Sequence, residues 1–263
     1  MTEILGYVGA VLIGIVLGLI GGGGSILTVP IFVYVLGIEP ILATAYSLFV
    51  VGSTAFVGTV RNTLGNTIDY KTGIIFAIPT FIAVFLTRKF LIPVIPDSLF
   101  FIGSFEITKS VGIMMFFALI MALAAFFMIK GRKDTSQKDQ KTDYNYPLII
   151  VESIIVGVLT GIVGAGGGFL IIPALVLLAK IPMKKAVGTS LMIIAIKSLI
   201  GFIGDVQNFD IDWAFLFSFT AFSIIGIFIG IYLNIFIDSK SLKKGFVWFV
   251  LIMAIYIILK EIL

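Results

Sequence analysis

Two glycine clusters interrupt long apolar runs of this chain. The first cluster lies in Gly18–Pro30 (GLIGGGGSILTVP) and the second in Gly161–Pro173 (GIVGAGGGFLIIP). Glycine loses more backbone entropy than any other residue on entering a helix, and it tolerates sharp turns. In lipid, a broken helix leaves N–H and C=O groups unpaired unless protein or a cavity satisfies them. The clusters therefore predict two helix breaks that the protein must compensate, which indicates a function for them.

The apolar runs are those of a polytopic membrane protein. Of the 263 residues, 60% are hydrophobic and 12% are charged, whereas a soluble domain carries about 25% charged residues. Several runs reach the roughly 20 residues that a helix needs to cross a bilayer. The N-terminal run lacks the basic region and cleavage site of a signal peptide, so we expect it to be retained. We therefore expect a multi-pass protein of the cell (inner or plasma) membrane, with the lipid bilayer as its surroundings.

The residue types that are missing exclude several functions. The sequence contains no cysteine and no histidine, which excludes thiol catalysis and removes the commonest metal ligand. No carboxylate pair stands at catalytic spacing, and no Gly-Lys-Ser/Thr of a nucleotide-binding loop follows either glycine cluster. We expect no enzyme, no cofactor and no metal. With a net charge of only +4, we expect no nucleic-acid partner either.

The two glycine clusters belong to an internal repeat. A shift of 143 residues, the separation of Gly21 from Gly164, also pairs Ser47 with Ser190 without a gap. Apolar composition alone would not align glycines and serines together. Transporters are commonly built from such duplicated halves.

The repeat divides the chain into three parts. We expect residues 1–130 to form the first transmembrane repeat, 131–146 a cytoplasmic linker loop, and 147–263 the second transmembrane repeat. The linker is the one long polar stretch and has the composition of a flexible loop. The predicted apolar segments are Ile4–Leu36, Ile41–Leu64, Gly73–Ile92, Val111–Ile129, Pro147–Ala179, Ala186–Gly204, Trp213–Ile237 and Leu242–Leu259.

The charges of the loops favour inverted halves. Lysine and arginine accumulate on the cytoplasmic side, which places the lysine-rich linker inside. If the second broken segment returns to this side as a re-entrant hairpin, the basic loop at 180–185 is also inside and the acidic loop at 205–212 is outside. The loop predicted to hold Arg88, Lys89 and Lys109 then falls outside, against the rule.

The predicted fold class is therefore an all-α polytopic membrane protein with two inverted-topology repeats. Each repeat has one glycine-broken, re-entrant hairpin plus three transmembrane helices, and both termini lie outside. Ile4–Leu36 would measure about 50 Å as a straight helix, which is too long for one untilted crossing of a roughly 30 Å core. A parallel arrangement of eight crossings, in which the broken segments cross fully, is the alternative.

Each glycine break precedes a short predicted helix, at Ile26–Leu36 and Phe169–Ala179. The start of such a helix has free N–H groups and the positive end of the helix dipole, which bind an anion without a charged side chain. The alternative is that the glycines only allow close helix packing. The candidate substrate-binding residues are Gly21, Gly22, Gly23, Gly24, Ser25, Ser47, Gly164, Ala165, Gly166, Gly167, Gly168, Ser190 and Lys197.

Lys197 is the candidate that supplies charge, because it lies far from either end of its apolar run. A lysine at that depth faces the interior or a pathway and would neutralise an anion; alternatively, it snorkels or pairs with an acid such as Asp205. Ser47 and Ser190 would donate to a substrate oxygen or bond to their own helix backbone. Glu152 is a candidate carrier of a coupling proton.

The two glycine-rich segments resemble the duplicated signature of the TauE/SafE family of membrane permeases. GLIGGGGSILTVP and GIVGAGGGFLIIP are each followed by a helix with a small polar step, AYSLF and VGTSLM, and Ala165 stands where the family has a glycine. The resemblance implies transport of sulfur-containing anions, with sulfite export as the name-giving activity. We expect a secondary transporter that exports sulfite or a related oxyanion or organosulfonate by alternating access, with a possible coupling ion. The alternatives are an anion channel, or a transporter of the same fold for another small solute.

Overall fold

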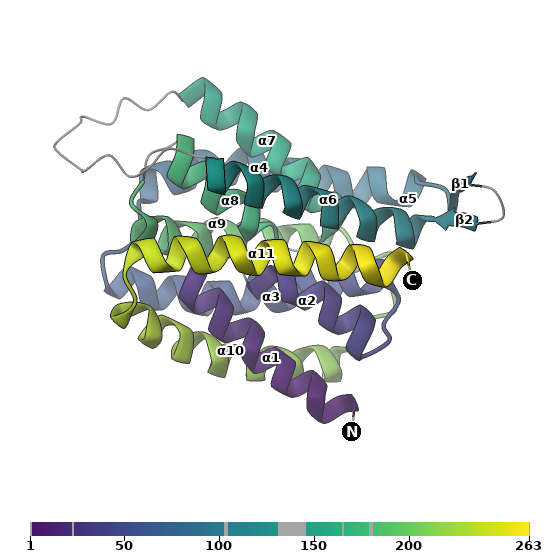
Figure 1. Ribbon diagram of the computed structural model, residues 1–263, viewed down its shortest axis with the longest axis horizontal. Helices are drawn as coiled ribbons and strands as arrows, with labels where there is room; N and C mark the ends of the chain where they lie inside the picture. Colours follow the sequence, from purple (N-terminus) through teal and green to yellow (C-terminus); the bar gives the residue numbers. More distant parts are fainter. Residues whose placement is uncertain are drawn as a thin grey trace.

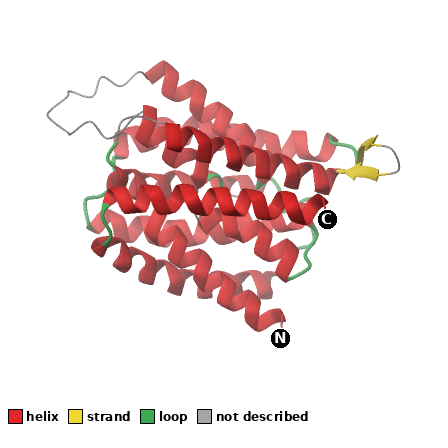
Figure 2. Ribbon diagram, in the orientation of Figure 1, coloured by secondary structure: helices red, strands yellow, loops and turns green. Residues whose placement is uncertain are grey.

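The computed structural model describes residues 2–22, 24–102, 105–130, 146–164, 166–178 and 181–262. Helices dominate these residues (Figures 1 and 2). Their bounds are α1 (Thr2–Ile20), α2 (Gly24–Pro30), η1 (Ile31–Val35), α3 (Pro40–Leu64), α4 (Tyr70–Leu86), η2 (Thr87–Leu91), α5 (Ile92–Val94), α6 (Lys109–Lys130), α7 (Tyr146–Val163), α8 (Gly168–Pro173), η3 (Ala174–Leu178), α9 (Met183–Ile203), α10 (Trp213–Phe236) and α11 (Ser239–Ile262).

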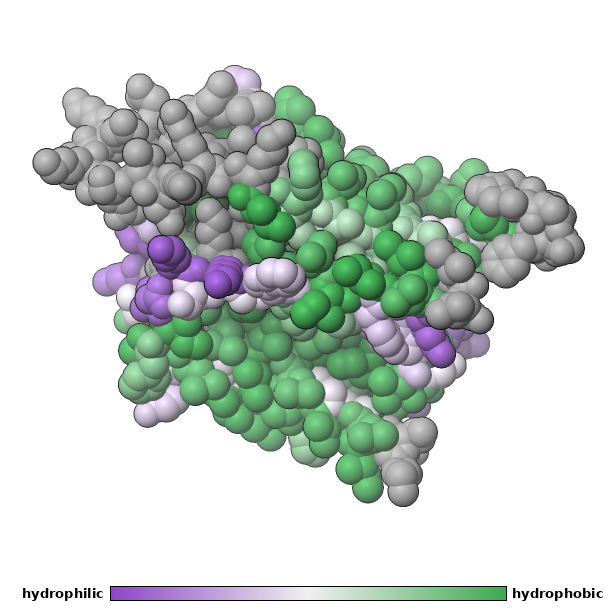
Figure 3. Space-filling model, in the orientation of Figure 1, coloured by the Kyte–Doolittle hydropathy of each residue, from purple (hydrophilic) through white to green (hydrophobic). Residues whose placement is uncertain are grey.

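Six helices of the described residues are long and apolar enough to cross a membrane: α3, the helix formed by α4 through α5, α6, α9, α10 and α11. Hydrophobic residues cover most of the described part of the face in Figure 3, and hydrophilic residues gather toward its left and right ends. The protein is therefore a multi-pass membrane protein. The innermost helices are α3 and α9, because 67% and 78% of their apolar windows are buried, against 35% to 50% in the other four.

The first glycine cluster folds the chain back on itself. Helix α1 ends with the bond from Gly21 N to Leu17 O (2.7 Å), and Gly21 has a φ of +76°, a left-handed conformation that favours glycine. Beyond the turn, α2 and η1 return along α1, since Gly24 lies against Leu17 and Leu36 lies against Gly6. Figure 1 follows this hairpin from the N-terminus to the middle of the molecule and back.

The second cluster makes the equivalent break between α7 and α8. Gly164, Gly166 and Gly167 all have left-handed φ values of +59° to +67°, so any side chain there would strain the backbone. Both predicted breaks are present. The helices that follow start at Gly24 and Gly168, slightly earlier than predicted, and turn into π-helix directly after Pro30 and Pro173, where proline removes a helical N–H donor.

Helix α1 packs along α10 through glycines that the sequence analysis did not single out. Side chains at Gly14 and Gly18 would overlap the backbone of α10, and side chains at Gly226 and Gly230 would overlap the backbone of α1. In both pairs the glycines are separated by three intervening residues, the small-xxx-small spacing that allows two helix backbones to approach closely.

Helix α7 packs along α4 in the same manner. Gly157 lies against Ala83 and Gly161 lies against Thr87, and the 143-residue shift relates these positions to those of the α1–α10 contact. The first arm of each half therefore packs on the third element of the other half. The remaining large contacts join α3 to α9, α6 to α11 and α4 to α9.

The all-α prediction is incomplete in one place. Strands β1 (Ser98–Ile102) and β2 (Phe105–Thr108) form an antiparallel pair at one end of the molecule, beyond α5 and α6 (Figure 2). Their sequences, SLFFI and FEIT, are rich in the aromatic and β-branched residues that favour strands. The linker predicted at 131–146 lies almost wholly outside the described residues.

Candidate functional site

The two glycine breaks meet inside the protein. The backbone of Gly22 lies against that of Gly168, so that a side chain at either position would overlap the other chain segment. A Cβ atom at Gly21 would lie 2.6 Å from Ser190 Oγ of α9. In the other half, Gly164 packs directly on Thr44 of α3. Each break is thus held by the inner helix of the opposite half.

The hydroxyl groups at the first break bind its own carbonyl groups. Ser25 Oγ donates to Gly22 O (2.6 Å), and Thr28 Oγ1 donates to Gly24 O (3.0 Å). Ser190 Oγ lies 2.9 Å from Gly21 O, across the two halves, and 2.8 Å from Val187 O of its own helix, so its single hydrogen serves one of the two carbonyl groups at a time. The hydroxyl groups of Ser25 and Ser190 therefore lie where they can donate to the carbonyl groups of Gly22 and Gly21 at the break, which is the compensation that a broken helix requires.

Lys197 lies at the second break. Its side chain is 1% exposed, and its Nζ donates to Thr160 Oγ1 (2.9 Å). A Cβ atom at Gly167 would lie 2.7 Å from this Nζ. Gly167 is the N-cap of α8, where the first helical N–H groups have no partner within the helix.

No ion pair of Lys197 is found among the described residues. The alternative that it pairs with Asp205 is wrong, because Asp205 binds Arg88. A buried ammonium group without a carboxylate is costly unless another anion compensates it. The surroundings of Lys197 therefore suit a negatively charged ligand.

Four buried hydroxyl groups have no hydrogen-bond partner within the described part of the chain: Ser47 and Thr54 of α3, Ser198 of α9 and Ser223 of α10. All four side chains are 0% exposed. Thr54 is the repeat counterpart of Lys197, and Ser47 lies about one turn from Thr44, which contacts the second break. Buried hydroxyl groups are normally paired, so a bound ligand or water would complete them. Ser198 was not predicted from the sequence.

Two candidate residues, Gly23 and Ala165, lie outside the described residues. Gly166 is described, and it packs against Val51 of α3 and the Cβ atom of Ser25. Glu152, the candidate proton carrier, is partly buried in α7.

The prediction that Arg88 lies in an outer loop is wrong. The helix of α4 continues through η2 and α5 to Val94, and Arg88 is 1% exposed. Arg88 Nε donates to Asp205 Oδ2 (2.7 Å), and its Nη1 donates to Thr44 Oγ1 (3.0 Å) and Gly161 O (3.3 Å). Arg88 thereby joins α3, α7 and the turn after α9. The sequence signal was an arginine inside an apolar run, but its partner lies 117 residues away.

Six long apolar helices among the described residues, with two contacting helix breaks between them, define a multi-pass membrane protein. The chain matches the family model described as "Sulfite exporter TauE/SafE" over residues 7–257. It belongs to the TauE/SafE family of membrane transporters.

Its relatives carry transporter names. A "Probable membrane transporter protein" of Xylella fastidiosa (strain 9a5c) is 29% identical over 252 residues, which cover 94% of this chain and 91% of the relative. "Probable membrane transporter protein YunE" of Bacillus subtilis is 28% identical over 97% of this chain and 96% of its own length. "Probable membrane transporter protein MJ0441" of Methanocaldococcus jannaschii is 38% identical over 116 residues, 42% of this chain and 43% of the relative. No solved structure matches.

Proposed function

We propose that this protein is a secondary transporter that exports a small sulfur-containing anion, sulfite or a related oxyanion or organosulfonate. The single observation that carries the proposal is Lys197, which is buried at the second glycine break and whose one hydrogen-bond partner among the described residues is a neutral hydroxyl group. A bound anion would compensate this charge and would also interact favourably with the positive end of the helix that begins at Gly168.

The remaining groups of the proposed site fit a small oxyanion. Gly22 and the glycines at 166–168 have no side chain of their own to cover their backbone N–H groups, and the hydroxyl groups of Ser47 and Thr54 lack partners among the described residues. Such donors match the several oxygen atoms of sulfite or a sulfonate. The family description, "Sulfite exporter TauE/SafE", supports the same class of substrate.

We further propose that the halves, residues 1–130 and 147–263, have inverted topology. The repeat-equivalent helices α3 and α9 run antiparallel, since Leu48 lies near Gly201 and Gly58 lies near Leu191. Equivalent helices of a parallel duplication would run in the same direction. The hairpin of α1 with α2 and η1 supports a re-entrant segment, and the six long helices supply three crossings for each half.

Alternating access would then use the contact between the two breaks. Gly22 and Gly168 touch through their backbones, and inverted-repeat transporters bind their substrate at such a junction near the bilayer midplane. Movement of one hairpin away from the other would open the site to one side at a time. The close backbone contact favours a carrier over a permanently open channel.

Reconstitution of the full chain into liposomes tests the proposed function. Liposomes loaded with sulfite, thiosulfate, sulfoacetate or, as comparisons, chloride and phosphate should release a sulfur anion at a saturable rate. External substrate should accelerate this release by exchange, as expected of a carrier. If none of the sulfur anions is transported, the substrate assignment is wrong; if release does not saturate and shows no exchange, the carrier mechanism is wrong.

A further inference from the structure

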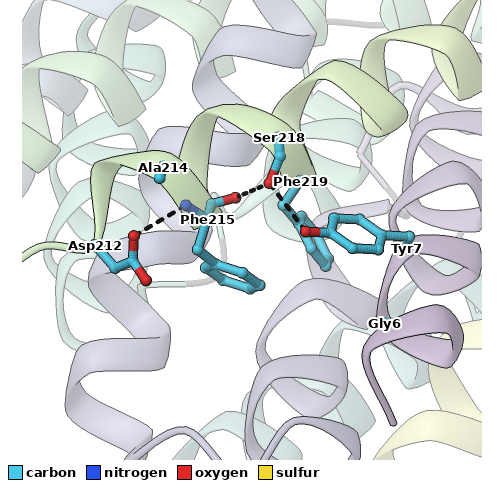
Figure 4. Close-up of a pocket in the computed structure, with 7 residues that line it drawn as sticks. All are labelled: Gly6, Tyr7, Asp212, Ala214, Phe215, Ser218 and Phe219. Atoms are coloured by element: carbon cyan, nitrogen blue, oxygen red, sulfur yellow. Dashed lines mark hydrogen bonds between the residues drawn. The ribbon is translucent and has the colours of Figure 1, made fainter. Parts of the chain in front are cut away.

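A cavity lies at the N-terminal ends of α1 and α10, away from the glycine breaks. Its volume is about 360 Å³, within the range of small-molecule sites. Figure 4 shows its lining. The side chains come from Tyr7 of α1 and from Asp212, Phe215, Ser218 and Phe219 at the start of α10.

The hydroxyl groups of this cavity have no hydrogen left for a ligand. Ser218 Oγ donates its hydrogen to Phe215 O (2.8 Å). The contact between Tyr7 Oη and Ser218 Oγ (3.1 Å) must therefore use the hydrogen of Tyr7, because each hydroxyl group has only one. Tyr7 and Ser218 thus present only acceptor lone pairs to the cavity.

Asp212 adds a negative charge to these acceptors. It is the N-cap of α10, and one carboxylate oxygen, Oδ1, accepts from Phe215 N (3.0 Å). Its backbone N–H donates to Tyr46 Oη (2.8 Å), which fixes the position of the residue. A carboxylate and acceptor-only hydroxyl groups repel an oxyanion and attract a cation that donates hydrogen bonds.

Aromatic rings complete the lining. The rings of Phe215 and Phe219 lie 5.6 Å apart, and Tyr7 lies 6.4 Å from Phe219. Phe32 of η1 packs behind them, 4.8 Å from Phe219. Aromatic faces attract organic ammonium groups, whereas metal ions require more oxygen ligands.

The cavity lining occurs in one half only. The 143-residue shift relates Asp212 to Asp69, also the N-cap of its helix. The positions equivalent to Tyr7 and Ser218, however, hold Ile150 and Ile75. The capping carboxylate therefore belongs to the duplicated scaffold, whereas the hydroxyl groups around it do not.

We propose that this cavity binds a small primary ammonium group. Its N–H groups would donate to the carboxylate of Asp212, with its carbon chain against the rings of Phe215 and Phe219. Asp212 directly precedes the span that begins at Trp213, so the ligand is either a free amine or the ethanolamine headgroup of a lipid. The proposal is independent of the anion site.

Titration of purified full-length protein with ethylammonium chloride tests the site. Saturable binding is expected for the wild type, and Asp212→Asn should weaken it at least about tenfold, since asparagine still caps the helix but carries no charge. The matched control is Asp69→Asn, which makes the same change at the equivalent cap and should bind like the wild type. Thermal unfolding of both Asn variants verifies that they are folded.

Native mass spectrometry distinguishes a lipid headgroup from a free amine. The protein is purified from vesicles of phosphatidylethanolamine or phosphatidylcholine, and the lipid that it retains is identified. Phosphatidylethanolamine retained by the wild type but not by Asp212→Asn supports a lipid headgroup; ethylammonium binding without lipid retention supports a free amine. If the wild type neither binds ethylammonium nor retains phosphatidylethanolamine, the proposal is overturned. It is also overturned if Asp212→Asn and Asp69→Asn weaken ethylammonium binding equally. Sulfite transport serves as an independent readout, because it depends on the other site.

Discussion

Two buried cationic side chains in this protein have opposite surroundings. Arg88 has a carboxylate partner, Asp205, and two further oxygen acceptors. Lys197 is equally buried but contacts a hydroxyl group, Thr160 Oγ1. A compensated charge stabilises an arrangement of helices, whereas an uncompensated one remains available to a ligand. The difference assigns Arg88 to the architecture and Lys197 to the proposed anion site.

Replacement of Lys197 by methionine should therefore impair anion binding without impairing folding. We expect Lys197→Met to lower the affinity for the transported sulfur anion at least about tenfold, because one charge-assisted interaction is lost. Stability should be unchanged or raised, since methionine fits an apolar interior. Anion titrations and thermal unfolding measure the two effects. Lys109→Met is the matched control, as Lys109 is also buried and donates to a neutral oxygen, Ile92 O. If both variants lowered the anion affinity equally, Lys197 would have only a structural role.

The contact between the two breaks leaves no room for a methyl group. Gly22→Ala should abolish transport, because its Cβ atom would overlap the backbone of Gly168, while insertion into the membrane should be unaffected. Gly245→Ala in α11 is the control, since nothing lies within 4 Å of its Cβ position; it should stabilise the helix by up to about 1 kcal/mol. Transport assays in liposomes and thermal unfolding compare the two. Full transport by Gly22→Ala would show that the breaks do not have to touch.

At the scale of elements, hydrophobic segments predicted the long helices closely. The segment expected at Ile41–Leu64 is the helix Pro40–Leu64, and the one expected at Trp213–Ile237 is Trp213–Phe236. These boundaries follow from local signals, such as the capping carboxylates of Glu39 and Asp212. The glycine clusters likewise marked both breaks, because a left-handed backbone requires glycine at those positions.

The elements that were missed depend on contacts remote in sequence. The helix that contains Arg88 continues past its charged residues because Asp205, just beyond the end of α9, compensates the guanidinium group. The predicted segment Gly73–Ile92 included Arg88, but the loop charges assigned this residue to a loop, since an apolar run does not reveal a partner 117 residues away. In the candidate site, Lys197 was predicted because it is a charge in an apolar run. Its position beside Gly167 and the unpaired hydroxyl group of Ser198 could be known only from the packing of α8 on α9.

The contributions of Arg88 and Asp205 to the stability of the protein should be strongly coupled. Arg88→Met alone should destabilise the protein by about 3–5 kcal/mol, because it leaves a buried carboxylate without its partner. The double variant Arg88→Met/Asp205→Leu should recover most of that loss, since apolar replacement of a buried pair is often neutral or stabilising. Denaturant unfolding in detergent micelles measures both variants and Asp205→Leu alone. Additive losses in the double variant would contradict the coupling that the geometry implies.

At the scale of the whole molecule, the two halves share a scaffold but differ in their charges. The packing of α1 on α10 and of α7 on α4 follows the same 143-residue shift. Yet Lys197 is equivalent to Thr54, and Arg88 is equivalent to Ile231. The duplicated scaffold therefore provides two similar breaks, whereas the charges near them come from single positions. For that reason the repeat predicts where a site lies but not which side chains make it selective.

The orientation of the halves can be decided with one pair of cysteine variants, because the sequence contains no cysteine. Thr63 and Val206 are exposed, lie at the ends of α3 and α9, and are related by the 143-residue shift. With inverted halves, Val206→Cys should react with a membrane-impermeant thiol reagent on intact cells, and Thr63→Cys should react only after the cells are permeabilised. Both substitutions conserve size, and sulfite transport by each variant verifies that the fold is retained. In the parallel arrangement of eight crossings, equivalent positions share one side of the membrane. Labelling of both cysteines, or of neither, on intact cells would therefore exclude the inverted topology.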